Sequence, residues 1–177
     1  MQNGLAPEDQ MKKLLTPVAY INSIFDITPQ MLKNKGIYGL ILDIDNTLVA
    51  THIKKADEKA ISFIRSLKEN GIKAVIVSNG KKKRVEYFCQ PLDIKFLYKA
   101  HKPLRGALNK AIEMMGLSND KVAILGDQLF TDVLGGNLIG IHSILVKPID
   151  LEEPFFIKLK RILEKPFLKN VEFRDNF

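Results

Sequence analysis

The amino-acid sequence predicts an α/β fold of three layers, in which a parallel sheet lies between two layers of helices. Two observations support this fold class. Between residues 38 and 146, short apolar runs alternate with stretches of helical hydrophobic spacing, as in repeated βαβ units. The chain also has 177 residues, of which 46% are hydrophobic and 27% charged, which is enough to form one domain with a real core.

Continuous apolar runs predict the strands, because a strand covered by helices on both faces has no polar side. These runs cover residues 38–44, 72–77, 122–125 and 142–146, and a weaker strand is expected near residues 96–98. Turn residues mark the ends of the runs, such as Ser78-Asn79-Gly80 after the second run.

Helices are expected between these strands. Residues 57–70 place their apolar side chains on one helical face, and Gly71 ends that helix. A short helix is expected over residues 82–88. Pro103 is expected to open a third helix, for which Gly116 provides the C-cap.

The sheet-forming region has short flanks on both sides. A single domain over residues 14–150 is expected to include an N-terminal flank before the first apolar run. Residues 1–13 are expected to form a flexible lead, in which Met11 is an alternative start to Met1. Residues 151–177 are expected to form a basic amphipathic tail.

Cysteine content and hydropathy predict the compartment. The single Cys89 excludes a disulfide framework and a cysteine-rich zinc site, and it indicates a reducing environment. The longest uncharged run, residues 133–146, is shorter than the ~20 residues that a membrane-spanning helix needs. The N-terminus has no signal-peptide pattern. The sequence therefore predicts a cytoplasmic protein that is not integral to a membrane.

Positive charge is concentrated in the central third of the chain. The formal net charge is +7, and residues 51–110 hold 15 basic and 5 acidic residues, a net charge of +10. They include the basic run Lys81-Lys82-Lys83-Arg84. A run of this kind either attracts nucleic acid or anionic lipid, or it forms an ordinary solvated helix face.

Polar side chains follow four of the predicted strands at their carboxyl ends. They are Asp43, Asp45 and Thr47 at the end of the first run and just beyond it, Ser78 and Asn79 after residues 72–77, Lys102 after the weak strand, and Asp127 with Asp132 after residues 122–125. Because ligands bind at the carboxyl ends of the strands in such sheets, we expect these side chains to form one site.

This set of side chains is suited to phosphate chemistry. Clustered carboxylates need a cation among them, and hard oxygen ligands select Mg²⁺, which commonly also binds a substrate phosphate. A lysine and a hydroxyl fit the phosphate oxygens. One carboxylate can then attack phosphorus to form an aspartyl phosphate, and a second can transfer protons. No glycine-rich P-loop is present, which argues against a nucleotide kinase of that class.

The motifs resemble, in order and spacing, the four motifs of the haloacid dehalogenase superfamily of phosphotransferases, which have a Rossmann-like fold. The matching residues are Asp43-x-Asp45-x-Thr47, Ser78, Lys102 and Gly126-Asp127-x-x-x-x-Asp132. The resemblance implies that Asp43 is the nucleophile and Asp45 the general acid and base. It also implies that Ser78 and Lys102 bind the phosphoryl group. Asn79 is either a turn former or a substrate contact.

The same resemblance implies the ligands of a Mg²⁺ ion. They are the Asp43 side chain, the Asp45 backbone carbonyl and Asp127, and Asp132 orients the metal shell. The acidic pair of the fourth motif is spaced one residue wider here than in some relatives. The division of roles between Asp127 and Asp132 therefore stays open.

The spacing of the motifs leaves no room for a cap domain. Members of the superfamily that act on small metabolites often carry a cap after the first motif or between the second and third. Here residues 47–78 and 78–102 hold only the predicted helices, strands and loops. We therefore expect a capless enzyme with an open rim, which can admit a protein, a nucleic-acid end or a lipid head group.

The two flanks favour a membrane substrate. Residues 14–37 carry a partial apolar stripe that Pro17 interrupts, and residues 155–170 combine apolar and basic side chains. The second segment either lies on an anionic membrane as an amphipathic helix or packs on the domain. With the sequence GLILDIDNTL, the chain resembles the YqeG-type branch of subfamily IIIA, which includes phosphatidylglycerophosphate phosphatases. That resemblance implies phosphatidylglycerophosphate as the substrate and peripheral membrane contact.

Two alternatives remain at this stage. The first is a phosphatase that acts on a phosphoprotein or on a nucleic-acid terminal phosphate. The second is a non-catalytic nucleic-acid-binding protein on the same fold, although a pure binder has no need of both Asp43 and Asp45. The sequence makes no prediction about the oligomeric state.

Overall fold

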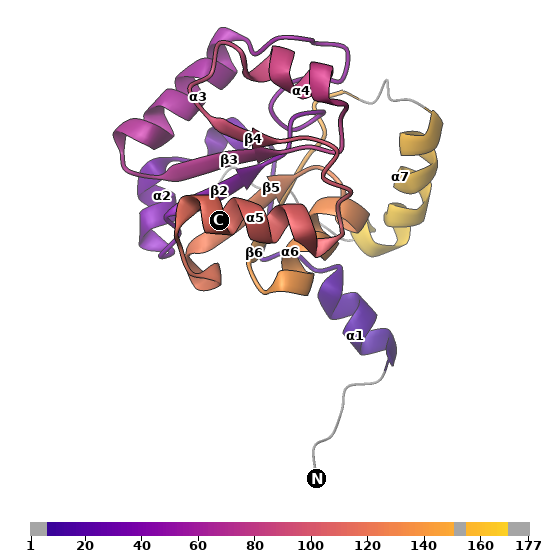
Figure 1. Cartoon of the computed structure of the whole chain (residues 1–177). Helices are drawn as coiled ribbons and strands as arrows, with labels where there is room; N and C mark the ends of the chain where they lie inside the picture. The colour runs from indigo at the N-terminus through magenta and orange to yellow at the C-terminus, as the bar shows by residue number, and fades with distance from the viewer. Residues whose placement is uncertain (1–6, 151–154, 170–177) are drawn as a thin grey trace.

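A computed structural model of the chain describes residues 7–150 and 155–169 and confirms the α/β class. A six-stranded sheet has the order β1-β6-β5-β2-β3-β4, and every neighbouring pair is parallel (Figure 1). The strands are β1 Ala19–Ile21, β2 Gly39–Leu42, β3 Lys73–Val77, β4 Lys95–Leu97, β5 Val122–Gly126 and β6 His142–Val146.

Helices cover both faces of the sheet and complete the three layers (Figure 1). The described helices are α1 Pro7–Leu14, α2 Pro29–Asn34, α3 Glu58–Glu69, α4 Lys82–Cys89, α5 Arg105–Met115, α6 Leu134–Ile139 and α7 Phe155–Leu168. Of these, α1 projects away from the sheet and α7 stands beside it (Figure 1). Strand β2 shows why its sequence is apolar throughout. Leu40 and Leu42 pack into the cluster that holds α3 and α4, whereas Ile41 between them packs against α5.

The predicted elements from residue 38 onward are confirmed, with small changes at their ends. Helix α5 begins at Arg105, with Leu104 as its N-cap, so Pro103 lies in the preceding turn and does not open the helix. Gly116 is the predicted C-cap, with a left-handed φ of 62°. Only α3 and its loops lie between β2 and β3, and only α4 and its loops between β3 and β4. The capless architecture is confirmed.

The N-terminal flank differs from the prediction. Residues 1–13 were expected to be flexible, but residues 7–13 belong to the helix α1. The apolar stripe of residues 14–37 is divided among the edge strand β1, the 3-10 helix Ile24–Asp26 and α2. Ile21 and Ile24 have no exposed surface, so this segment completes the core. Strand β1 could not be predicted, because it is only three residues long and its partner, β6, lies far along the chain.

The uncharged run before β6 contains helical structure that was not predicted. A π-helical turn, Leu129–Val133, leads into α6, and Gly136 lies in that helix. A Cβ atom on Gly136 would come within 2.5 Å of Ile124 Cγ2 in β5. Gly136 therefore allows α6 to lie close against β5. Among the residues described, no helix is long and apolar enough to cross a bilayer.

Candidate active site

The loop after β2 carries the first pair of carboxylates. The Asp43 N–H donates to the Leu125 carbonyl at 3.0 Å, so Asp43 extends the pairing of β2 with β5. Asn46 has a φ of 62°, and its side-chain amide exchanges two hydrogen bonds with the backbone of Asp150, at 2.9 and 3.2 Å. These contacts shape the loop so that Asp43 and Asp45 line the same cavity.

Lys102 is the buried cation of this site. Its Nζ lies 2.7 Å from Asp43 Oδ1 and 2.6 Å from Asp132 Oδ1, and the residue is only 6% exposed. The Asn79 side chain accepts a hydrogen bond from the Lys102 N–H at 2.7 Å and donates one to the Lys102 carbonyl at 3.2 Å. Asn79 therefore positions Lys102, a role that the sequence did not predict, and its side chain also lines the cavity.

Ser78 lies at the end of β3 and is 2% exposed. Its hydroxyl accepts a hydrogen bond from the Gly80 N–H at 3.0 Å, which closes the turn after the strand. Ser78 and Lys102 line the same cavity as Asp43, although they come from different loops. Because the strands are parallel, three separate carboxyl ends meet at this edge of the sheet.

Three buried carboxylates form a candidate cation site. One oxygen from each of Asp43, Asp127 and Asp132 lies within 4.8 Å of the other two. The Thr47 hydroxyl donates to Asp127 Oδ1 at 3.4 Å, which joins the loop after β2 to the end of β5. A donor set made only of oxygen atoms fits a hard divalent cation such as Mg²⁺ or Mn²⁺.

Burial is the main influence on the pKa values of the carboxyl groups in the site. Burial raises the pKa of Asp43 to about 7, with Lys102 opposing the shift and the Asp132 and Asp45 charges adding to it. Burial also raises the pKa of Asp127 well above its usual value. Burial alone would lower the pKa of Lys102, but the charges of Asp132 and Asp43 outweigh it and raise that pKa. A bound cation would stabilise the ionised carboxylates.

Arg84 is a site residue that the sequence did not reveal. It is the last residue of the basic run, and its guanidinium lies 2.8 Å from Asp45 Oδ1. A second nitrogen donates to the Lys54 carbonyl at 3.0 Å, so Arg84 also holds the loop before α3. One residue of the basic run, Arg84, therefore belongs to the site. The spacing between Arg84 and the motifs carried no signal for this contact.

Helix α7 supplies the remaining wall of the site. It stands beside the edge of the sheet at which the strands end (yellow in Figure 1). The Arg161 guanidinium pairs with the Asp127 carboxylate and donates to the Asp127 carbonyl. It also lies 3.3 Å from Glu164, which accepts a hydrogen bond from the Phe130 N–H. Of the two alternatives for residues 155–170, packing on the domain is therefore observed for one face of the helix.

The resulting cavity has a volume of about 230 Å³. The predicted residues Asp43, Asp45, Ser78, Asn79, Lys102 and Asp132 line it, together with Ile157 and Lys160 of α7. Asp127 lies beside it, covered by Thr47 and Arg161. The structure therefore brings all the predicted site residues together, and α7 narrows the rim that the sequence predicted to be open.

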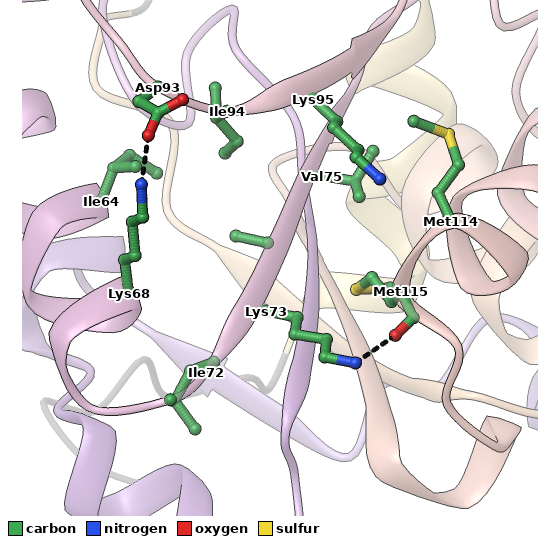
Figure 2. A pocket seen from close by; sticks show the side chains of 12 residues that line it. Ile64, Lys68, Ile72, Lys73, Val75, Asp93, Ile94, Lys95, Met114 and Met115 are labelled. Carbon is green, nitrogen blue, oxygen red and sulfur yellow. Dashed lines mark hydrogen bonds and ion pairs between the residues drawn. The ribbon is translucent and has the colours of Figure 1, made fainter.

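A larger cavity of about 680 Å³ lies around the first residues of β3, away from the carboxyl ends of the strands (Figure 2). Two of its lysines are held by protein groups. Lys68 pairs with Asp93, and Lys73 Nζ donates to the Met115 carbonyl at 2.6 Å. The described residues that line this cavity include no cluster of carboxylates, so the chemistry is expected at the smaller one.

Comparisons with known proteins agree with this assignment. Residues 43–140 match the family model of haloacid dehalogenase-like hydrolases. The chain is 42% identical over 158 residues to the probable phosphatase YqeG of Bacillus subtilis, and the match covers 89% of this chain and 92% of that protein. It is 26% identical over 171 residues to the chloroplastic and mitochondrial phosphatidylglycerophosphate phosphatase 1 of Arabidopsis thaliana. That match covers 89% of this chain but only 48% of the Arabidopsis protein.

Solved structures show the same fold. The cobalt-bound deoxy-D-mannose-octulosonate 8-phosphate phosphatase of Haemophilus influenzae superposes with a TM-score of 0.55 at 16% identity, over 77% of this chain and 90% of that one. A putative subfamily IIIA hydrolase from Legionella pneumophila gives a TM-score of 0.50 at 20% identity, over 77% of this chain and 71% of that one.

Proposed function

The chain belongs to the haloacid dehalogenase-like hydrolases and is a phosphatase of that family, and from this membership we propose that it is a Mg²⁺-dependent phosphomonoesterase with an aspartyl-phosphate intermediate. One observation carries the proposal. Lys102 Nζ bonds to both Asp43 and Asp132 at the floor of a small polar cavity. This lysine can hold a phosphoryl oxygen beside the carboxylate that attacks phosphorus.

The proposed reaction has two steps. Lys102 and the Ser78 hydroxyl hold the phosphoryl oxygens while Asp43 attacks phosphorus and the bond to the leaving oxygen breaks. Asp45 gives a proton to that oxygen. In the second step Asp45 takes a proton from a water molecule, whose oxygen attacks phosphorus, and the bond from phosphorus to Asp43 breaks. The products are the alcohol, inorganic phosphate and the original enzyme.

The proposed Mg²⁺ ligands are the Asp43 side chain, the Asp45 carbonyl and Asp127, and the ion would offset negative charge on the phosphoryl group. Asp132 is proposed to act as a positioning residue. Its Oδ1 binds Lys102, and its Oδ2 accepts from the Gln128 N–H at 3.3 Å and the Thr131 hydroxyl at 3.2 Å. These contacts occupy both Asp132 oxygens.

The proposed substrate is phosphatidylglycerophosphate or another large phosphate ester. The Arabidopsis relative named for that lipid supports the substrate class. The cavity volume of about 230 Å³ is below the ~300–1,000 Å³ of pockets that enclose a drug-sized ligand, so the cavity admits only part of such a substrate. The rest of a large substrate would lie outside, along Ile157 and Lys160. Because the chain is a phosphatase, the purely binding alternative is excluded.

A phosphate-release panel tests both the reaction and the substrate. It compares phosphatidylglycerophosphate in mixed micelles with sugar phosphates, nucleotides, phosphopeptides and 5′-phosphorylated oligonucleotides, in Mg²⁺ and in EDTA. We expect the lipid to be hydrolysed fastest and EDTA to stop turnover. A preference for phosphopeptides or oligonucleotides would select the first alternative instead.

The variant Asp43→Asn tests the assignment of Asp43 as the nucleophile. We expect a loss of at least ~10³-fold in kcat, because no other described residue in the cavity is placed to take the phosphoryl group. The circular dichroism spectrum should be unchanged, since the amide has the same shape and relieves repulsion from Asp132. Substantial turnover in a well-folded variant would refute Asp43 as the nucleophile.

A further inference from the structure

The outward face of helix α7 is apolar, whereas its inward face carries the polar side chains Arg161 and Glu164. Leu159, Ile162 and Leu163 are 47%, 57% and 58% exposed. Their spacing of three and four residues places them on one face of the helix. A surface helix of a globular protein normally has the opposite arrangement, with apolar residues toward the core. The described residues therefore leave the outer face of α7 exposed.

The orientation of the helix is set by its inner face. Arg161 is tied to Asp127, and Glu164, which has no exposed surface, accepts from the Phe130 N–H at 3.3 Å. Ile157, one turn before Arg161, lines the catalytic cavity. Rotating the helix to bury its outer apolar face would break these contacts. The exposure of Leu159, Ile162 and Leu163 is therefore a consequence of how α7 closes the site.

Cationic side chains border the exposed apolar face. Lys158, Lys160, Lys165 and Lys169 are all exposed, whereas the one acidic residue in the described part of the helix, Glu164, is buried against Arg161. The basic run that starts at Lys81 adjoins the same opening, because Gly80 and Lys160 line one cavity. An apolar strip with lysines around it is complementary to an anionic lipid surface, where head groups lie above acyl chains.

A second copy of the chain is a poorer occupant. A stable protein interface buries about 800 Å² on each partner, which is far more than three half-exposed side chains provide. Two copies of α7 face to face would also bring their lysines together, and like charges oppose such association.

We propose that the outer face of α7, formed by Leu159, Ile162 and Leu163 with the flanking lysines, is a docking surface for an anionic bilayer. This inference rests on the proposed function in one respect, because it assigns the surface from which a lipid phosphate would enter the catalytic cavity. Ile157 and Lys160 belong to both the helix and the cavity wall. Docking of the outer face would therefore hold the catalytic cavity one helix diameter, ~10 Å, from the head groups, so that a phosphorylated head group could reach it past Lys160 with its acyl chains still in the bilayer.

The test is co-sedimentation of the full chain with vesicles, either of phosphatidylcholine alone or mixed with phosphatidylglycerol. We expect binding to the anionic vesicles, weaker binding at high salt and little binding to the neutral ones. Ile162→Glu should lower the partition coefficient about tenfold or more, because it removes an inserted side chain and adds a negative charge. Val18→Glu is the matched control, since Val18 is 61% exposed but precedes β1.

Hydrolysis of a soluble aryl phosphate shows that each variant is folded, and we expect the wild-type rate from both. The proposal is overturned if the wild type does not sediment with anionic vesicles, if Ile162→Glu sediments as well as the wild type, or if Val18→Glu loses as much binding. Analytical ultracentrifugation showing a dimer that Ile162→Glu dissociates would assign the face to a second copy and overturn it too. Absence of aryl phosphatase activity despite vesicle binding would instead contradict the proposed function.

Discussion

Replacing Arg161 with alanine should destabilise the metal-free protein strongly. The Asp127 side chain has no exposed surface, and the Arg161 side chain that pairs with it is 17% exposed. Removing one partner of a buried ion pair costs ~3–5 kcal/mol, because the remaining charge is left without compensation. Asp127 can relieve part of this by taking up a proton, since burial already raises its pKa. We therefore expect a loss near the lower limit, about 3 kcal/mol.

The loss should be much smaller with Mg²⁺ bound. A cation held by Asp43 and Asp127 would supply the positive charge that Arg161 supplies without it. The guanidinium and the ion would then compete for the same carboxylate, so the variant should bind Mg²⁺ at least as tightly as the wild type. Because of this competition, Mg²⁺ binding at Asp127 would weaken the contact that holds α7 against the site.

Thermal unfolding followed by circular dichroism measures the first effect, in EDTA and in saturating Mg²⁺. About 3 kcal/mol corresponds to a decrease in Tm on the order of 6–12 °C for a chain of this size. Titration calorimetry measures the affinity for Mg²⁺. Lys165→Ala, an exposed lysine on the same helix, is the matched control and should change neither quantity. A variant as stable as the wild type in EDTA, or one that binds Mg²⁺ more weakly, would refute the reasoning.

Three further changes test the site. Burial raises the pKa of Asp43 to about 7. Between about pH 4 and 7 the folded metal-free protein therefore keeps a proton on Asp43 that the unfolded chain has lost. Its free energy of unfolding should fall as the pH rises through this range. Urea unfolding in EDTA should show this slope, and Asp43→Asn should make it smaller, leaving the part that Asp127 contributes. Gly126→Ala would place a Cβ atom 2.2 Å from Asp132 Cγ, so we expect at least a ~10-fold loss of kcat. Gly106→Ala, which meets no atom within 4 Å, should keep full activity. Arg84→Ala frees Asp45 and should lower kcat ~10-fold, whereas Lys82→Ala should not; equal rates for both variants would remove Arg84 from the site.

Most of the catalytic residues could be predicted because their signals are local. Asp43 and Asp127 each lie at the end of an apolar run that is typical of a buried strand, and the parallel arrangement then brings the carboxyl ends together. Lys102 comes after the weak strand β4, which is only three residues long, and motif order supported its place in the site. The role of Asn79 stayed open because its partner, the backbone of Lys102, lies 23 positions away.

The sequence by itself determined the layered α/β fold, the capless motif spacing and the residues that meet at the sheet edge, because each depends on short-range hydropathy and on the handedness of parallel connections. Only the tertiary structure decided which face of α7 turns inward. The amphipathic pattern of residues 155–168 fits either orientation, and the choice depends on Arg161 reaching Asp127, 34 positions earlier. In the same way, Arg84 meets Asp45 across 39 positions. Such contacts carry no local signal, because the chain brings their partners together only when it folds.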